Sequence, residues 1–234
     1  MFLTDEKHRN TVWLGSFFTR KWNNVSEIVY FEKEYGGRPL LKKAKSLAKE
    51  NNLIFNSSMV NENYKHLWTS SGWLEKEKLN VLSLNLKNLN KKDSKEVKPE
   101  YLTNSHFEEL LHLDKSIFDN YWQNSLASFQ ETLDSCNKNY LFKQTNGEEI
   151  VGYAILGVTN GFSYLQRFGI NRNCHSLGYG QNMLEDVISF AKRKNYINMK
   201  LNTQEKNLVA QNLYLKNGFE FTKTNFIIFE SNHI

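Results

Sequence analysis

Two short motifs in the last third of the chain combine residues that can bind an anion and move a proton. The first is the turn Gly178-Tyr179-Gly180, which precedes a strongly amphipathic segment at 182–194. Glycines there let successive backbone N–H groups face a ligand, and the following helix adds the positive end of its dipole. The turn therefore predicts a pyrophosphate site, although a Gly-x-Gly sequence before a helix is also common as a plain tight turn.

The second motif follows about 30 residues later, in Leu201–Phe221. Its members have the spacing N-x-x-A-x-x-x-Y-x-x-x-G-F and are Asn207, Ala210, Tyr214, Gly218 and Phe219. A phenol with a pKa of about 10 is protonated at neutral pH and can serve as a general acid. The alternative is that Tyr214 is a core aromatic residue of an amphipathic helix.

The apolar periodicity predicts the elements that hold these motifs. In the second half we expect helices at 106–118, 125–136, 182–194 and 207–216, and strands at 140–143, 150–158, 162–170, 197–202 and 222–230. The turn NGEE at 146–149 is typical of a hairpin between the first two strands. Helices, antiparallel strands and then an alternation of strands and helices indicate a mixed α/β layer fold.

The two motifs, in this order and separation, resemble the acetyl-CoA-binding half of the GNAT superfamily of N-acetyltransferases. The resemblance covers roughly residues 97–234. The segments FDNYW (118–122), YLQRFGI (164–170) and NTQ (202–204) also look like bacterial ribosomal-protein-alanine N-acetyltransferases. The resemblance implies a GNAT fold, a mixed and mostly antiparallel sheet flanked by helices. It also implies transfer of an acetyl group from acetyl-CoA, the co-substrate, to a primary amine of a small molecule or protein N-terminus, by direct attack in a ternary complex.

The resemblance also assigns residues to the acetyl-CoA site. Backbone groups of Phe168, Gly169 and Ile170 would pair with the pantetheine arm as an added strand would. The pyrophosphate turn would comprise His175, Ser176, Leu177, Gly178, Tyr179, Gly180 and Gln181. Asn207 would hydrogen-bond the cofactor arm, Ala210 would leave room for it, and Tyr214 would protonate the leaving thiolate. His175 departs from the family, which usually has Gln or Arg at that position.

On the acceptor side, the resemblance points to Phe118, Asp119 and Trp122, with Tyr121 between them. These aromatic side chains suit a flat or apolar acceptor or the first residues of a peptide. The alternative is that Phe118 and Trp122, four residues apart, form one buried helical face.

The general base is not evident from the sequence. Many relatives have a Glu on the strand before the Tyr-bearing helix, where this chain has Asn202-Thr203-Gln204. A water held by Asn202 or Gln204 is one candidate relay, and Asp119 and Glu205 are others. This departure leaves open a catalytically weak or inactive GNAT-like module that binds CoA or a partner.

The first part of the chain resembles a degenerate, partial copy of the second. We expect strands at 11–18, 25–32, 53–57 and 79–86 and helices at 40–48 and 62–69. Aligned with the second half, Asn63 falls near Asn207, Trp68 near Tyr214, and Gly72-Trp73 on Gly218-Phe219. The tandem arrangement is similar to that of mycothiol synthase; an unrelated small α/β module is the alternative. The polar segment 89–96 predicts a linker, so the domains are 1–88, a smaller α/β unit without catalysis, and 97–234, the GNAT domain.

Composition narrows the function classes. Residues 1–95 carry 17 Lys and Arg against 10 Asp and Glu, whereas residues 96–234 carry 13 against 15. No basic run exceeds two residues, which favours a solvated surface over nucleic-acid binding and leaves an RNA acceptor the weakest alternative. Cys136 and Cys174 lack metal-ligand spacing, and no metal is expected. Without a signal sequence or an apolar run of membrane length, we expect a cytoplasmic monomer or homodimer.

Overall fold

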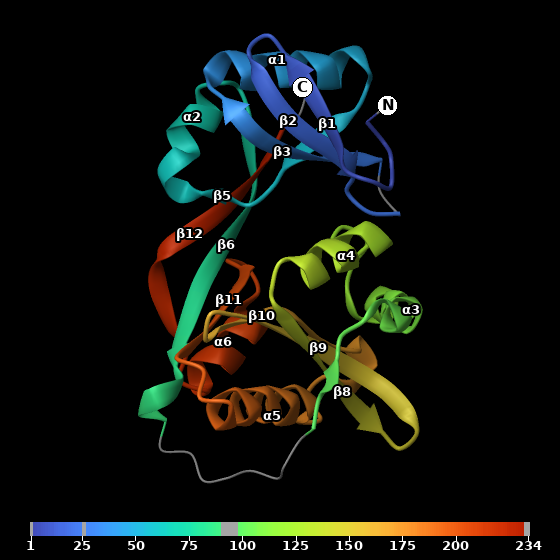
Figure 1. The fold of residues 1–234 in the computed structure, drawn as a ribbon, viewed down its shortest axis with the longest axis vertical. Coiled ribbons are helices and arrows are strands. Elements are labelled where there is room, and N and C mark those ends of the chain that lie inside the picture. The colour runs from blue at the N-terminus through green and yellow to red at the C-terminus, as the bar shows by residue number, and fades with distance from the viewer. Residues whose placement is uncertain (1, 25–26, 90–97, 232–234) are drawn as a thin grey trace. The chain divides into compact units, whose positions relative to one another are not determined.

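The chain folds into two units whose boundaries do not follow the order of the sequence (Figure 1). The N-terminal unit comprises residues 1–80 and 223–234, and the C-terminal unit comprises residues 81–222. The computed structural model describes residues 2–24, 27–89 and 98–231. The predicted linker, 89–96, therefore lies outside the described residues apart from Leu89.

The N-terminal unit is a mixed sheet with one long helix. Its elements are β1 (His8–Val12), β2 (Gly15–Lys21), β3 (Ile28–Gly36), α1 (Arg38–Glu50), β4 (Ile54–Ser57), β5 (Val60–Asn61), η1 (Glu62–Tyr64), α2 (Lys65–Thr69) and the first part of β6 (Leu74–Asn85). The strand order is β1-β2-β3-β4-β12, and β5 also pairs with β12 (Glu220–Glu230). Strands β3 and β4 are parallel, whereas β1, β2 and β3 are antiparallel neighbours.

One predicted strand in this unit was wrong. Residues 11–18 were expected to form a single strand, but the chain turns at Trp13-Leu14 and forms the hairpin of β1 and β2. Two apolar residues occupy the turn, and Trp13 is 92% exposed. Gly15 closes the turn with a φ of 144°, a conformation open to glycine. Because the turn residues are apolar, no polar residues marked the break between the two strands in the sequence.

The C-terminal unit follows the expected order of elements. They are η2 (Leu86–Asn88), β7 (Glu100–Tyr101), η3 (Asn104–His106), α3 (Phe107–Ile117), α4 (Leu126–Asp134), β8 (Lys138–Asn146), β9 (Glu149–Thr159), β10 (Phe162–Ile170), η4 (Arg172–Cys174), α5 (Tyr179–Arg193), β11 (Asn198–Gln204) and α6 (Leu208–Lys216). The strand order is β6-β11-β10-β9-β8-β7. The helices and strands predicted here are confirmed, with shifts of a few residues at their ends.

Alternation along the strands gives the C-terminal unit two cores. On β8 and β9, Tyr140 and Leu156 belong to a cluster with α5, whereas Leu141 and Tyr153 belong to a cluster with α3 and α4. Successive side chains of a strand point to opposite faces, so the sheet is covered on both sides. This mixed, mostly antiparallel sheet flanked by helices is the GNAT fold that was predicted.

Strands β6 and β12 each cross the boundary between the units. The last part of β6 adds to the C-terminal unit beside β11, and β12 adds to the N-terminal unit beside β4, with Glu230 opposite Asn56. Leu82, Leu84 and Leu86 are at most 2% exposed in the core of the C-terminal unit. The predicted domain ranges 1–88 and 97–234 therefore differ from the compact units at these two strands.

The two units contain matched backbone motifs. After α2, the N–H of Trp73 donates to the carbonyl of Trp68 (3.2 Å); after α6, the N–H of Phe219 donates to the carbonyl of Tyr214 (3.1 Å). The glycines between them have φ angles of 84° and 87°. Helices α1 and α5 likewise end in the same way, with positive φ at Asn52 and Asn195. Of these positions, the sequence alignment of the two halves had paired Trp68 with Tyr214 and Gly72-Trp73 with Gly218-Phe219.

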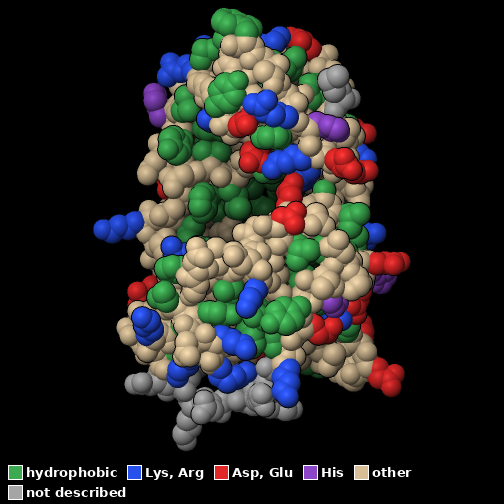
Figure 2. Space-filling view, in the orientation of Figure 1, with side chains coloured by type: hydrophobic (Ala, Val, Ile, Leu, Met, Phe, Trp, Pro, Cys, Tyr) green, Lys and Arg blue, Asp and Glu red, His purple; other side chains and the backbone are tan. Residues whose placement is uncertain are grey.

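Many basic side chains of the N-terminal unit lie beside acidic ones. On the face drawn in Figure 2, Lys and Arg side chains alternate with Asp and Glu in this unit. Several are paired, as in Arg9–Glu34 (2.7 Å), Lys65–Glu75 (2.7 Å) and Lys76–Glu230 (2.9 Å). The structure thus gives the basic N-terminal part a mixed, ion-paired surface.

Because β6 and β12 each run from one unit into the other, an arrangement called strand exchange below, we predict that a fragment cut at the expected domain boundary will not fold. Fragment 97–234 lacks the three buried leucines of β6 and η2, each worth about 2 kcal/mol or more. That loss is comparable with the roughly 5–15 kcal/mol that stabilises a whole domain. We expect fragment 97–234 to show no cooperative thermal unfolding by circular dichroism, whereas fragment 81–234 unfolds cooperatively. Equal, sharp transitions in both fragments would contradict the role of β6.

Candidate active site

The parallel strands β10 and β11 separate soon after they meet. They pair only at Ser163–Met199 and Tyr164–Lys200. Beyond these pairs, β10 has a bulge between Leu165 and Arg167 and continues to pair with β9 on its other edge. The backbone of β10 from the bulge to Ile170 is thus left unpaired on the side of β11. Such an edge can receive an extended ligand as an added strand, as the sequence predicted for Phe168, Gly169 and Ile170.

The chain next forms a group of free backbone donors at the start of α5. From Ser176 through Gln181, six successive N–H groups donate to none of the described residues. Ser176 and Gly178 have positive φ angles of 63° and 86°, which turn the backbone into the helix. Consecutive N–H groups at a helix N-terminus form an anion site. The predicted pyrophosphate turn therefore has the donors that an anion requires.

The Gln181 side chain ties this helix start to α6. Its amide exchanges two 2.9 Å hydrogen bonds with the amide of Asn217, and Nε2 also donates to Glu185 (2.7 Å). Gln181 thus fixes the start of α5 against the helix that carries Tyr214. Its backbone N–H is left without a partner among the described residues.

The His175 side chain points back toward β10. Nε2 lies 2.9 Å from the carbonyl oxygen of Ile170, and because a carbonyl only accepts, this nitrogen carries the donated proton. His175 therefore fixes the backbone at the end of the strand. The departure from the Gln or Arg of relatives is used for a local hydrogen bond.

Tyr214 lies on α6 and is only 5% exposed. Its ring contacts Phe168 on β10 (centroids 6.1 Å apart) and Phe219 (5.7 Å). Among the described residues, its hydroxyl has no hydrogen-bond partner. Burial raises the pKa of the Tyr214 phenol above its ordinary value, so the hydroxyl stays protonated well past neutral pH. The structure thus brings a protonated phenol to the edge of β10 that β11 leaves open.

The other predicted residues of this region have structural contacts. Asn207 is the N-cap of α6: its side chain accepts from the N–H of Ala210 (3.2 Å) and Nδ2 donates to Gln204 (3.4 Å). Ala210 is half-buried against the core. Asn202 is exposed on β11, and no acidic residue occurs in that strand. The structure therefore assigns no base among Asn202, Thr203 and Gln204.

A buried ionic cluster, which was not predicted from the sequence, joins α3, β10 and the loop 118–124. Arg167 at the bulge donates to both oxygens of the fully buried Asp114 (2.7 and 2.9 Å) and to the carbonyl of Trp122 (2.6 Å). The Tyr153 hydroxyl also donates to Asp114, which accepts from the N–H of Asn124 (2.7 Å) as well. Although burial opposes its charge, Tyr153 and Asp114 raise the pKa of Arg167. The cluster fixes the loop 118–124 to the sheet.

Phe118 belongs to this packing. The Arg167 guanidinium lies 3.5 Å from the centre of the Phe118 ring, and a Cβ on Gly169 would come within 2.7 Å of the ring edge and also overlap Ile117. Glycine at 169 is thus required by the close approach of α3 to β10. Trp122 is half-buried, and its ring packs on Tyr121 (5.0 Å). Phe118 and Trp122, which were predicted to contact the acceptor, thus hold the loop in place through these packing contacts.

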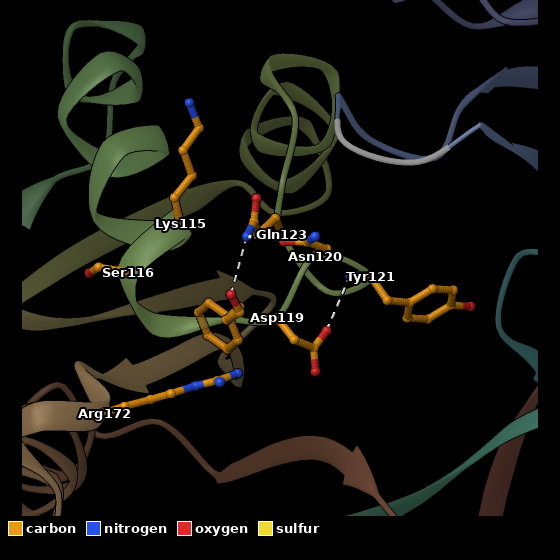
Figure 3. Close-up of a pocket in the computed structure, with 8 residues that line it drawn as sticks. Lys115, Ser116, Asp119, Asn120, Tyr121, Gln123 and Arg172 are labelled. Atoms are coloured by element: carbon orange, nitrogen blue, oxygen red, sulfur yellow. Dashed lines mark hydrogen bonds between the residues drawn. The ribbon is translucent and has the colours of Figure 1, made fainter.

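Beside this loop lies an open pocket of about 590 Å³ (Figure 3). Its lining comes from the end of α3, the loop that follows and η4, and comprises Lys115, Ser116, Phe118, Asp119, Asn120, Tyr121, Gln123 and Arg172. Asp119 Oδ1 accepts from the N–H groups of Tyr121 (3.2 Å) and Trp122 (3.1 Å). Phe118 links the pocket to β10. The structure thus brings two of the predicted acceptor residues, Phe118 and Asp119, into one pocket.

The matching region of the N-terminal unit is closed. Strands β3 and β4 pair at four positions, from Ile28–Ile54 to Phe31–Ser57, without diverging. Helix α1 begins with Arg38-Pro39, and proline has no N–H to offer. Trp68, aligned with Tyr214, is 2% exposed and stacked on Phe229 (5.2 Å). In the described part of this unit, β3 and β4 leave no open edge between them, and Pro39 interrupts the N–H groups at the start of α1.

Two features are absent from the described residues. No helix there is long and apolar enough to cross a membrane. No group of three or more His, Cys, Asp or Glu side chains in the same residues is arranged to hold a metal ion.

Comparisons with known proteins agree with this geometry. A profile of the Acetyltransferase (GNAT) family matches residues 105–219. A solved GCN5-related N-acetyltransferase from Sphaerobacter thermophilus is similar with a TM-score of 0.62 and 13% identity, over 93% of this chain and 76% of that one. A GCN5-related N-acetyltransferase from Kribbella flavida gives 0.61 and 10%, over 97% and 91%.

A tandem GNAT protein from the clavulanic acid biosynthesis pathway gives a TM-score of 0.58 and 12% identity, over 94% of this chain and 80% of that one. No curated protein matches the chain. At these identities the solved structures show the fold, and their coverage extends it over both units.

The buried cluster predicts a large effect of a small change. Asp114→Asn keeps the shape of the side chain but leaves Arg167 buried without its counter-charge, which costs about 3 kcal/mol. Urea denaturation measures the loss. Asp134→Asn, on the exposed part of α4, is the matched control and changes stability by less than about 0.5 kcal/mol. A loss as small as the control's would show that the cluster does not stabilise the fold.

Proposed function

Because residues 105–219 belong to the GNAT acetyltransferase family, we propose that the protein transfers an acetyl group from acetyl-CoA to a primary amine. The observation that carries the proposal is the open edge of β10, which leads directly into six free N–H groups at the start of α5. An extended arm ending in a pyrophosphate fits this combination of a strand edge and an anion site. Bound acetyl-CoA would supply the activated thioester carbonyl.

In this proposal the protein contributes binding, orientation and a proton. Backbone groups of Phe168, Gly169 and Ile170 hold the pantetheine arm, and the amides of Ser176–Gln181 hold the pyrophosphate. Tyr214 lies against Phe168 with a hydroxyl that has no other described partner, and it protonates the sulfur as the amine displaces it. The raised pKa of the phenol keeps that proton available at neutral and mildly alkaline pH. Asn207 acts mainly by ordering the start of α6.

The amine must lose a proton, and no carboxylate of β11 is there to accept it. We assign the acceptor side to the pocket beside the loop 118–124, where Asp119 is the carboxylate of the lining and follows Phe118, which packs against Gly169 of β10. Positioning of amine and thioester in one ternary complex supplies much of the rate in such a reaction. The reaction therefore does not require a dedicated base on β11.

We propose that the N-terminal unit is a degenerate GNAT-like copy without a catalytic site. The matched hydrogen bonds after α2 and α6 support a common origin of the two units. The continuous pairing of β3 with β4 and the stacked Trp68 leave no route for a cofactor. Its contribution is structural, through the exchanged strands.

Replacing the proposed acid tests this assignment. Tyr214→Phe removes the hydroxyl and keeps the ring contacts with Phe168 and Phe219. We expect kcat to fall about 100-fold, the usual scale of general-acid catalysis, while the Kd of acetyl-CoA stays unchanged. Tyr164→Phe, an exposed tyrosine on the same strand as Phe168, is the control and retains full activity.

Two outcomes distinguish the acid role of Tyr214 from the proposed acetyl transfer as a whole. An unchanged kcat in Tyr214→Phe would remove the acid role and leave the transferase intact. Calorimetry that detects no acetyl-CoA binding to the unaltered protein would contradict the enzyme and favour a GNAT-like module that binds a partner. A panel of amines and N-terminal peptides with acetyl-CoA then measures the acceptor range.

A further inference from the structure

The pocket beside the loop 118–124 carries two cations that no neighbour neutralises. Lys115 comes from α3 and Arg172 from η4, and both side chains are exposed. Among the described residues, neither side chain has an ion pair or a hydrogen bond. Elsewhere in the same unit, Lys143 is paired with Glu109 (2.7 Å) and Glu100 (3.6 Å). The pocket thus keeps positive charge available for a ligand.

The same pocket contains one carboxylate with a free oxygen. Asp119 is held by the N–H groups of Tyr121 and Trp122 at Oδ1, whereas Oδ2 has no partner in the described part of the chain. In Figure 3 the Arg172 side chain extends from the lower left toward Asp119, and Lys115 points up and away from both. Asp119 and Arg172 line one pocket without forming an ion pair with each other. A ligand with both charges can satisfy both groups.

We propose that the acceptor is an amine that also carries an anionic group, a carboxylate or a phosphate, a few bonds from its nitrogen. Arg172 binds the anion, Asp119 binds the amine as it enters, and Lys115 adds to the positive field. The planar guanidinium matches the paired oxygens of either anion. With two cations and one carboxylate, the lining is net positive and attracts such a ligand. This inference rests on the proposed acetyl transfer and narrows its acceptor to small zwitterionic amines.

The experiment compares matched acceptors with the full-length protein. The pairs are L-alanine with L-alaninamide and phosphoethanolamine with ethanolamine, which differ in the anion and keep the amine. We expect the anionic member of at least one pair to have the higher kcat/KM. Arg172→Gln should raise KM for that member about five-fold, the upper range for an exposed ion pair, and leave its neutral counterpart unchanged. Arg172→Lys should retain part of the preference.

Controls separate the acceptor from the phosphates of acetyl-CoA. KM for acetyl-CoA is measured for every variant and should not change, and the Kd of the preferred acceptor in the presence of CoA gives a readout without turnover. Lys138→Gln, an exposed cation on β8 outside the pocket, should leave all values unchanged. A rise in KM for acetyl-CoA alone would assign Arg172 to the cofactor and overturn the inference.

Failure of the inference and failure of the proposed function give different results. Equal use of the charged and neutral acceptors, or a clear preference for peptide N-termini, would overturn the inference while the transferase stands. Absence of turnover with every amine, together with no binding of acetyl-CoA, would overturn the proposed function and this inference with it.

Discussion

The bulge in β10 is the constraint on which the candidate site depends. Up to Tyr164, β10 pairs with β11 on one edge and β9 on the other; after the bulge only the pairing with β9 continues. A bulge bends its strand and increases the local twist, which re-aims the residues that follow. One irregularity therefore opens the strand edge that faces Tyr214 and directs Arg167 into the opposite core. The two sides of the site are set by a single backbone feature.

The buried charge of Arg167 at the bulge explains why the loop 118–124 keeps its place. A buried guanidinium must be paired, and Asp114 is fully buried on α3, where it accepts from Arg167, the Tyr153 hydroxyl and the N–H of Asn124. Because Arg167 also bonds the carbonyl of Trp122 and stacks on Phe118, the same pair fixes helix, loop and strand. The pocket with Asp119 and Arg172 is the outer edge of this assembly. Its free charges differ from the buried pair in facing solvent, where a ligand can reach them.

The features that were predicted correctly from the sequence are those that depend on short-range patterns. The Gly-x-Gly turn, the amphipathic helices and the position of Tyr214 follow from local spacing, and the structure has them. The pairing of Asp114 with Arg167 joins residues far apart in the chain, and no local rule predicts it. One signal was present, however: Asp114 shares the buried face of its helix with Leu110, Leu113 and Ile117. A carboxylate among core positions indicates a buried partner.

Strand exchange escaped the sequence for a related reason. The polar segment after residue 88 marks a break in composition, but composition does not say which sheet a flanking strand joins. Strand β6 follows α2 and strand β12 follows α6, and both are long. From the sequence, each could join the sheet of its own unit or that of the other.

The two units have matching backbone hydrogen bonds after α2 and α6 and differ at the strand pair before these helices. In the N-terminal unit, β3 and β4 are continuously paired and Trp68 is stacked in the core, so packed side chains and paired strands fill the matching region. With β10 and β11 separated at the bulge, the C-terminal unit leaves the same position to Tyr214. The length of this strand pairing, two positions in one unit and four in the other, thus decides which unit has an open strand edge.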